Sequence, residues 1–237
     1  MNLEKYQQYS RIARGLEKAD LVLKDARIVN VFTEEIIRGD IAIQDGIIAG
    51  IGSFHGKEER DLAGRYVCPG FIDSHLHLES TLVTPAELVT VASRHGTTTF
   101  IVDPHESANV SGLAGIDYIL DQTEDVKANV YVMMPSCVPA TAIDDNGCTL
   151  TAGDMAPYLH NSRILGLGEV MDSISVVQGE KSMHDKLELF EGRIRDGHAP
   201  FLEEGDLQAY AMAGIATDHE CSFFDYAMRE RRNGLTI

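Results

Sequence analysis

The sequence has few basic residues and no long apolar run. Its 237 residues include 20 lysines and arginines against 37 aspartates and glutamates, which gives a formal net charge of −17. This acidic character argues against a basic surface for nucleic acid or an anionic membrane. No apolar stretch is long enough to cross a bilayer, and the polar residues 1–19 do not fit a signal peptide.

Cysteine is also scarce. The four cysteines, Cys68, Cys137, Cys148 and Cys221, form no C-x-x-C pair and are too few for a disulfide scaffold in a chain of this length. Hydrophobic residues make up 44% of the chain, which is ample for a buried core. We therefore expect a soluble, cytoplasmic protein with one large α/β domain, or one domain and a small appendage.

The pattern of the chain changes twice and predicts three regions. Residues 1–19 are expected to form a short amphipathic helical lead. Residues 20–68 contain short strand-like runs and are expected to form part of a β-sandwich. Arg38-Gly39-Asp40 and Asp45-Gly46 separate these runs, and Asp45-Gly46 is a strong hairpin signal. Leu21 to Leu23 and Ala26 to Val31 are expected to be separate strands.

From residue 69 to residue 237, strands and helices alternate. Such alternation predicts parallel strands joined by helical crossovers. Strand starts recur close to the interval of ~30 residues expected when ~250 residues make eight βα units. We count about six such units, so we expect a (β/α)8-type barrel of which about six of eight units are present.

Several helix boundaries follow from local signals. Thr84, Pro85 and Glu87 are typical of a helix start, with Thr84 as the N-cap. Ser222 and Asp225 are read as a capping box for a later helix. The buried stripe of another helix is predicted from residues spaced four, three and four apart: Met183, Leu187, Phe190 and Ile194.

The segment Gly70 to Glu79 reads as the first barrel strand. Its bulky apolar residues alternate, so Asp73, His75 and His77 share the opposite face. Two imidazoles two residues apart at a strand end can bind one metal ion from one side. A lone His-x-His is as readily a pair of ordinary histidines, so the metal interpretation depends on the rest of the chain.

Further candidate metal ligands follow later strands. With the first pair, they make a set of four histidines and one glutamate: His75, His77, Glu169, His198 and His219. In a barrel the carboxyl ends of all strands converge on one mouth, so residues distant in sequence become neighbours. This set suits Mn, Fe or Zn, and a carboxylate can bridge two ions. The sequence therefore predicts a dinuclear metal site.

Two other polar segments follow strands. Asp103, His105 and Glu106 come after the second strand, where they suit acid–base chemistry and substrate contact, or alternatively a helix-capping loop. Ser136 belongs to a segment, residues 135–141, that follows the third strand. That segment could line a pocket with polar atoms or form a turn stiffened by proline.

The first-strand segment Pro69-Gly70-Phe71-Ile72-Asp73-Ser74-His75-Leu76-His77 resembles the signature of the amidohydrolase superfamily. Other segments resemble the adenine deaminase family within it. They are His77 to Ser80, Gly96 to Thr99, Asp103 to Val110, Pro135 to Thr141, Leu167 to Met171, Asp196 to Pro200 and His219 to Cys221 with the preceding Asp218. The ordered set spans Asp20 to the last residue.

This resemblance implies a composite β-sandwich beside a metal-dependent barrel. It also implies a Mn- or Fe-type dinuclear centre, with Zn possible, and hydrolysis of adenine to hypoxanthine and ammonia by a homo-oligomer. Glu106 is then the expected catalytic proton donor, and Asp103, His105 and Ser136 are expected to contact substrate. Glu169 stands where hydantoinase-like relatives would have a metal-bridging lysine.

The chain departs from this family in length. Members have two more barrel strands, with an aspartate at the end of the eighth, followed by returning sandwich strands. We therefore expect either a fragment of a longer gene product or a truncated paralogue without catalytic activity. An amidohydrolase that acts on another cyclic amide or acyl-amino substrate is the alternative enzyme.

Overall fold

The computed structural model describes residues 1–141 and 143–237. The chain divides into two compact units, Met1–Pro69 and Gly70–Ile237. Within the described residues, no helix combines the length and apolar character needed to span a bilayer.

The first unit is a five-stranded mixed sheet with one helix, α1 (Leu3–Ala13). Its strands run β3-β2-β1-β4, and β5 also pairs with β1. Neighbouring β1, β2 and β3 are antiparallel, whereas β4 and β5 run parallel to β1. The strands are β1 (Ala19–Asn30), β2 (Glu35–Gln44), β3 (Ile47–Gly52), β4 (Gly56–Asp61) and β5 (Tyr66–Val67). Ile12 of α1 is buried with Val22 and Ala42 of the sheet.

The hairpin predicted at Asp45-Gly46 is confirmed, because both residues have positive φ (52° and 74°) and join the antiparallel strands β2 and β3. That geometry is typical of two-residue hairpin turns. The prediction of two separate strands before this hairpin was wrong. Leu21 to Leu23 and Ala26 to Val31 do not form separate strands, since β1 runs from Ala19 to Asn30 with a register shift after Leu23.

The turn predicted at Arg38-Gly39-Asp40 lies instead inside β2. Gly39 pairs with Ala26 on one side, and a Cβ added to Gly39 would lie 3.2 Å from the carbonyl oxygen of Gly52. The glycine therefore permits close approach of the neighbouring strand rather than a chain reversal.

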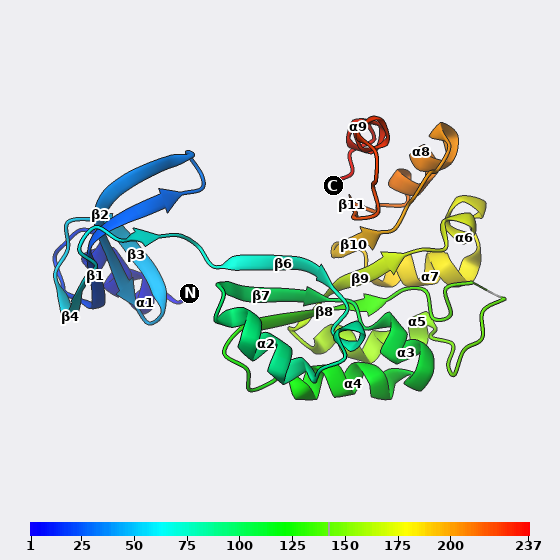
Figure 1. Cartoon of the computed structure of the whole chain (residues 1–237), viewed down its shortest axis with the longest axis horizontal. Coiled ribbons are helices and arrows are strands. Elements are labelled where there is room, and N and C mark those ends of the chain that lie inside the picture. Colours follow the sequence, from blue (N-terminus) through cyan, green and yellow to red (C-terminus); the bar gives the residue numbers. More distant parts are fainter. Residues whose placement is uncertain (142) are drawn as a thin grey trace. The chain divides into compact units, whose positions relative to one another are not determined.

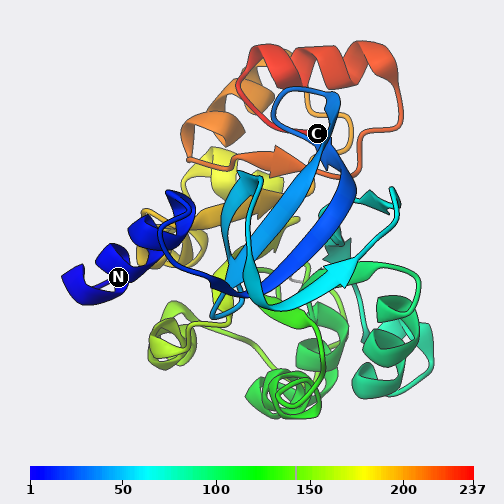
Figure 2. The same cartoon turned by 90° about the vertical axis from the view of Figure 1, so that its left-hand side faces the viewer.

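The second unit is built on a six-stranded parallel sheet in which the strands follow one another in sequence order (Figures 1 and 2). Its strands are β6 (Phe71–Leu76), β7 (Thr97–Val102), β8 (Asn129–Pro135), β9 (Ile164–Val170), β10 (Ile194–Gly197) and β11 (Thr217–Asp218). This arrangement is a half-barrel of six parallel strands. It confirms the α/β class and the alternation predicted from the sequence.

Helices connect the strands and cover them, as Figure 1 shows for β6 to β9. They are α2 (Pro85–Ser93), α3 (His105–Ser111), α4 (Leu113–Gln122), α5 (Ala152–Met155), α6 (Ser173–Gln178), α7 (Lys181–Leu189), α8 (Glu204–Met212) and α9 (Phe224–Arg232), with short 3-10 turns η1 (Glu79–Thr81) and η2 (Ala156–His160). The core lies where helix and strand side chains meet, as Ile116 of α4 does with Phe100 of β7 and Val132 of β8.

The helix boundaries agree with the sequence in part. Helix α2 begins at Pro85 with Thr84 as N-cap, as predicted. Helix α7 buries Met183 and Leu187 but ends at Leu189. Ile194 is therefore not part of its stripe: it lies in β10, beyond the loop that contains Gly192, whose φ is 78°.

The capping box predicted at Ser222 and Asp225 was wrong. Helix α9 begins at Phe224, and its N-cap is Phe223 rather than Ser222. Asp225 still lies in the first turn, and Arg229, Arg231 and Arg232 lie in the last turn. These charges suit the helix dipole at both ends.

Candidate metal centre

The two histidines of the first barrel strand lie side by side at its carboxyl end. His75 is in β6 and His77 follows its last residue, so both point to the same side of the strand. Their Nε2 atoms are 3.1 Å apart. Nδ1 of His77 lies 2.7 Å from the backbone carbonyl of Asp103 and donates to it, which leaves Nε2 free to bind a metal.

Glu169 is the centre of the cluster. This residue of β9 is only 3% exposed. Its Oε1 atom lies 2.7 Å from Nε2 of His75, 3.0 Å from Nε2 of His77 and 3.2 Å from Nε2 of His219. The other oxygen, Oε2, lies 3.3 Å from Nδ1 of His105. One carboxylate therefore faces imidazoles from three different strand ends, as the barrel topology predicts.

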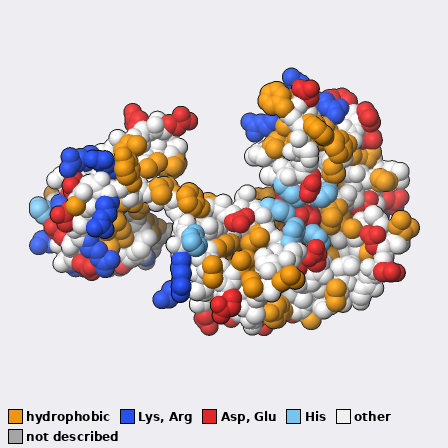
Figure 3. Space-filling view, in the orientation of Figure 1, with side chains coloured by type: hydrophobic (Ala, Val, Ile, Leu, Met, Phe, Trp, Pro, Cys, Tyr) orange, Lys and Arg blue, Asp and Glu red, His pale blue; other side chains and the backbone are white. Residues whose placement is uncertain are grey.

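His198 and His219 complete the set of imidazoles. The rings of His75 and His219 are stacked with centroids 3.6 Å apart, and the rings of His219 and His198 have centroids 5.6 Å apart. Ligand atoms of Glu169, His198 and His219 lie within 4.8 Å of one another, and so do those of His75, His77 and Glu169. The structure thus brings all five predicted metal ligands together. Histidine and acidic side chains gather on one face of this unit in Figure 3.

Asp196 belongs to the same cluster and was not predicted. Its Oδ2 atom lies 3.3 Å from Nδ1 of His75 and 3.5 Å from Nδ1 of His219. Thr217 donates its hydroxyl hydrogen to the other oxygen. A signal was present in the sequence, because Asp196 stands two residues before His198 and alternate residues of a strand share a face.

The carboxylates change the protonation of the imidazoles around them. Burial lowers the pKa of His75 and His219, but Asp196 and Glu169 more than offset this and raise these pKa values to about 9 and about 10. Glu169 raises the pKa of His77 to about 9. In turn, although burial opposes it, His219, His75 and His77 hold the pKa of Glu169 well below its usual range. These shifts favour pairs of a protonated imidazole and a charged carboxylate in this cluster.

These residues fit a divalent metal ion. The Nε2 atoms of His75 and His77 could hold one ion together, since they lie 3.1 Å apart and both face Oε1 of Glu169. Nδ1 of His198 is buried and has no hydrogen-bond partner within the described residues. The two ring nitrogens of His219 are also buried, and they face Glu169 and Asp196 at 3.2 and 3.5 Å without hydrogen-bond geometry. Buried polar atoms of this kind need a partner, and imidazole nitrogens with a carboxylate suit Zn, Fe or Mn.

Asp103 and His105 lie beside Glu169, and His105 faces its second carboxylate oxygen, Oε2. Asp103 is 1% exposed, and neither of its carboxylate oxygens has a hydrogen-bond partner within the part of the chain that is described. Its Oδ1 atom lies 3.7 Å from Nδ1 of His105, and burial raises the pKa of Asp103. Helix α3 begins at His105 with Pro104 as N-cap, so Asp103 is not the capping residue of that helix.

Glu106 and Ser136 have different surroundings from each other. Glu106 is exposed, and its Oε2 accepts a hydrogen bond of 2.6 Å from the hydroxyl of Ser80. Ser136 is fully buried, and its hydroxyl donates over 2.6 Å to the backbone carbonyl of Glu169. The carbonyl of Ser136 accepts a hydrogen bond of 2.6 Å from the buried amine of Lys186. Ser136 therefore supports the strand that carries Glu169.

A cleft of about 440 Å³ opens beside this cluster. Its walls include both apolar and polar side chains, among them His105, Glu106, Asn109, Val110, Cys137 and Met171. Cavities of this size and mixed character commonly bind small molecules.

Comparison with known proteins identifies a protein family and several relatives of this chain. Residues 66–233 match the amidohydrolase family. The chain is 56% identical over all its 237 residues to an adenine deaminase of Desulfitobacterium hafniense, and covers 42% of that protein. It is 48% identical over 227 residues, 95% of the chain, to an adenine deaminase of Clostridium acetobutylicum, of which it covers 40%.

A solved structure agrees at the level of the fold. The crystal structure of N-isopropylammelide isopropylaminohydrolase from Burkholderia multivorans matches with a TM-score of 0.54 and 18% sequence identity. The match covers 89% of this chain and 63% of that one.

Proposed function

Because the chain belongs to the amidohydrolase family, as its first-strand signature predicted, we propose that it contributes the metal centre of an enzyme that deaminates adenine to hypoxanthine and ammonia. The observation that carries this proposal is the position of Glu169, which faces His75, His77 and His219 at the mouth of the strands. Its relatives of 56% and 48% identity are adenine deaminases, and the chain spans about two fifths of their length.

The proposed ligands are the five residues predicted from the sequence: His75, His77, Glu169, His198 and His219. Their nitrogen and carboxylate donors favour Mn or Fe, with Zn as a further candidate. When bound, such ions act as Lewis acids and lower the pKa of a bound water from 15.7 towards ~7. We assign Asp196 a supporting role, since it faces the Nδ1 atoms of His75 and His219. That arrangement would orient the rings so that their Nε2 atoms are available to a bound metal.

The overall reaction replaces the amino group of adenine by oxygen. A C–O bond forms at C6 with water, the bond from C6 to the amino nitrogen breaks, and ammonia leaves. The ring or the departing nitrogen must receive a proton. We assign this proton delivery to Glu106, whose exposed carboxyl group lines the cleft next to His105.

The residues that line the cleft suit a flat heterocyclic substrate. Val110 and Met171 provide apolar walls, and Asn109 provides a polar amide. Asp144 and Asp145 add carboxylates, which can accept hydrogen bonds from the N–H groups of a purine. We propose that Asp103 and His105, which lie next to Glu169, also contact the substrate.

Ser136 has a weaker claim to substrate binding. Its hydroxyl already donates to the carbonyl of Glu169, and the side chain is fully buried. A direct contact with substrate would break that hydrogen bond. The structural contribution of Ser136 to β9 is the role that its contacts support.

The test is to express the gene that encodes this chain, purify its protein product, supply Mn²⁺ and measure the release of ammonia from adenine. We expect turnover that disappears when a chelator removes the metal and returns when Mn²⁺ is restored. Turnover of a cyclic amide or an acyl-amino compound without turnover of adenine would overturn the substrate assignment. A metal-loaded protein inactive on all these substrates would favour a non-catalytic role.

A further inference from the structure

Helix α3 carries two of the proposed active-site residues in its first turn, His105 and Glu106. The first N–H groups of any helix have no partner inside the helix and need one from elsewhere. The N-cap of α3 is Pro104, whose side chain has no oxygen to accept them. The position of α3 therefore depends on contacts from another segment.

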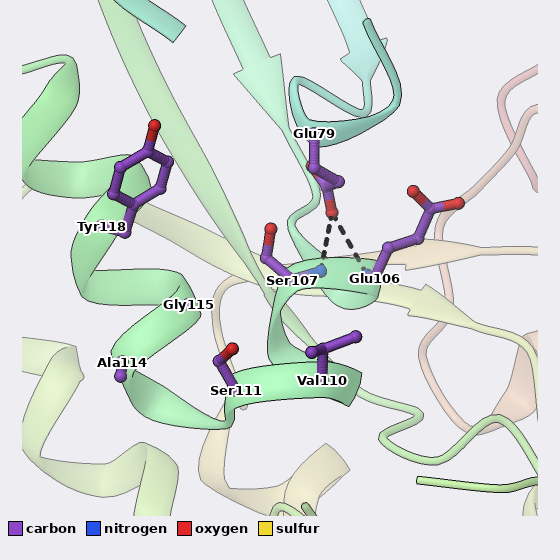
Figure 4. Close-up of a pocket in the computed structure, with 8 residues that line it drawn as sticks. All are labelled: Glu79, Glu106, Ser107, Val110, Ser111, Ala114, Gly115 and Tyr118. Atoms are coloured by element: carbon purple, nitrogen blue, oxygen red, sulfur yellow. Dashed lines mark hydrogen bonds between the residues drawn. The ribbon is translucent and has the colours of Figure 1, made fainter. Parts of the chain in front are cut away.

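Glu79 supplies that contact from the turn after β6. Its Oε1 atom accepts hydrogen bonds from the backbone N–H of Glu106 (3.2 Å) and of Ser107 (3.3 Å). Figure 4 shows the Glu79 side chain above the start of the helix, with both bonds drawn. Glu79 follows His77 by two residues, so the chain that carries a proposed metal ligand also caps the helix that carries Glu106.

Ser80, the next residue, contacts the side chain of Glu106. Its hydroxyl donates to Oε2 of Glu106 over 2.6 Å. Two consecutive residues thus hold both the backbone and the carboxyl group of Glu106. Helix α3 also packs closely against α4, because a Cβ on Gly115 of α4 would lie 2.4 Å from the carbonyl oxygen of Ser107.

We infer that Glu79 and Ser80 are positioning residues for the proton donor Glu106. Glu79 fixes the start of α3 through its two hydrogen bonds to backbone N–H groups. Ser80 fixes the orientation of the Glu106 carboxyl group through its hydrogen bond to Oε2. The expected effect of these contacts on catalysis rests on the proposed function. The contact itself does not depend on that function.

The first test compares Glu79→Ala with Glu79→Gln and with Glu87→Ala as a matched control. Glu87 is an exposed glutamate in the first turn of α2. A misplacement of ~1 Å can cost ~10²-fold in rate, so Glu79→Ala should lower kcat on adenine by about 10- to 100-fold. Glu79→Gln retains an acceptor oxygen and should restore most of the rate. Metal content should stay unchanged in all three variants.

A double-mutant cycle then tests the route through Glu106. Ser80→Ala and Glu79→Ala should each cost much less in a Glu106→Gln background than in the otherwise unchanged protein, because interacting residues are not additive. Equal losses in both backgrounds would overturn the positioning role. So would a loss of rate in Glu79→Ala that Glu79→Gln does not recover.

Amide hydrogen exchange separates this inference from the proposed function. Glu79→Ala should accelerate exchange at the N–H groups of Glu106 and Ser107, whereas Glu87→Ala should not. If adenine is not turned over but this exchange changes as described, the proposed function fails while the helix contact stands. Unchanged exchange at both amides would overturn the contact itself.

Discussion

Asp196 and His75 form a pair in which Oδ2 of the carboxylate lies 3.3 Å from Nδ1 of the ring. Nε2 of the same ring lies 2.7 Å from Oε1 of Glu169. The two nitrogens of one imidazole therefore face two carboxylates on opposite sides. Asp196 can hold the Nδ1 proton and direct Nε2 towards a metal, an arrangement common among histidine ligands.

Replacing Asp196 by asparagine should therefore weaken metal binding. Loss of such a carboxylate partner typically costs 10- to 100-fold in metal affinity, and we expect a loss of about that size. Competition for Mn²⁺ with a chelator of known affinity measures it. Asp125→Asn is the control, because Asp125 is an exposed aspartate in a turn. Equal affinities of both variants would remove Asp196 from the centre.

Metal binding should release protons at neutral pH. Without metal, the pKa values of His75, His77 and His219 are raised to about 9, 9 and 10, so all three rings are protonated at pH 7.5. Only neutral imidazole binds a metal, so about three protons should leave on binding. Apparent affinity should accordingly rise with pH up to the region of these pKa values.

Calorimetric titration of Mn²⁺ in buffers with different ionisation enthalpies gives the number of protons released. A number near zero at pH 7.5 would contradict the assignment of these rings as ligands.

Glu106 and His75 should respond differently to substitution. Glu106→Gln should keep the metal and lower kcat by about 10²- to 10⁴-fold, the range for general acid–base catalysis. His75→Ala should lose metal and activity together, since a ligand is gone. Elemental analysis and steady-state rates on the same preparations distinguish the two. Loss of metal from Glu106→Gln would assign Glu106 to the metal site.

Glu230 should make stability depend on pH. This residue of α9 is fully buried, and neither carboxylate oxygen has a hydrogen-bond partner within the described residues. Burial, with the charge of Asp218 adding to it, raises the pKa of Glu230 to about 7 from its ordinary value of 4.5. The folded state therefore binds this proton more tightly than the unfolded state.

The stability that this proton contributes is complete below about pH 4.5 and is lost as the pH rises to about 7. Glu230→Gln should remove this decline. Urea unfolding of both proteins at several pH values between 4.5 and 8 checks it. Parallel pH profiles of the two proteins would show that Glu230 is not protonated in the fold.

The sequence predicted most of this cluster of histidines and carboxylates, because the parallel strands of a barrel bring residues that are distant along the chain close together. His75, His198, His219 and Glu169 each stand at a strand end, and parallel strands bring those ends to one mouth. The spacing of Asp196 and His198 indicates that the two share a face, but it does not show that Asp196 faces the Nδ1 atoms of His75 and His219. That relationship depends on ring orientation, which only the packed structure sets.

The local errors have a similar cause. Gly39 is a turn residue by composition, but in β2 it serves close packing against Gly52. Ser222 is a favourable N-cap, yet the helix starts one residue later than that cap would require. Local propensities are modest in energy, and tertiary contacts override them. The contact of Glu79 with α3 is of this kind, since it joins residues 27 and 28 positions apart.

The most direct test of the account is the metal content of Glu169→Gln. Among the described residues, Glu169 offers the one carboxylate that faces His75, His77 and His219 together. A neutral amide neither bridges two cations well nor offsets their charge. Elemental analysis after dialysis against Mn²⁺, with Asp125→Asn as control, should show severe loss of metal in Glu169→Gln alone. Metal content equal to that of the unchanged protein, with normal turnover of adenine, would contradict a metal centre built around Glu169.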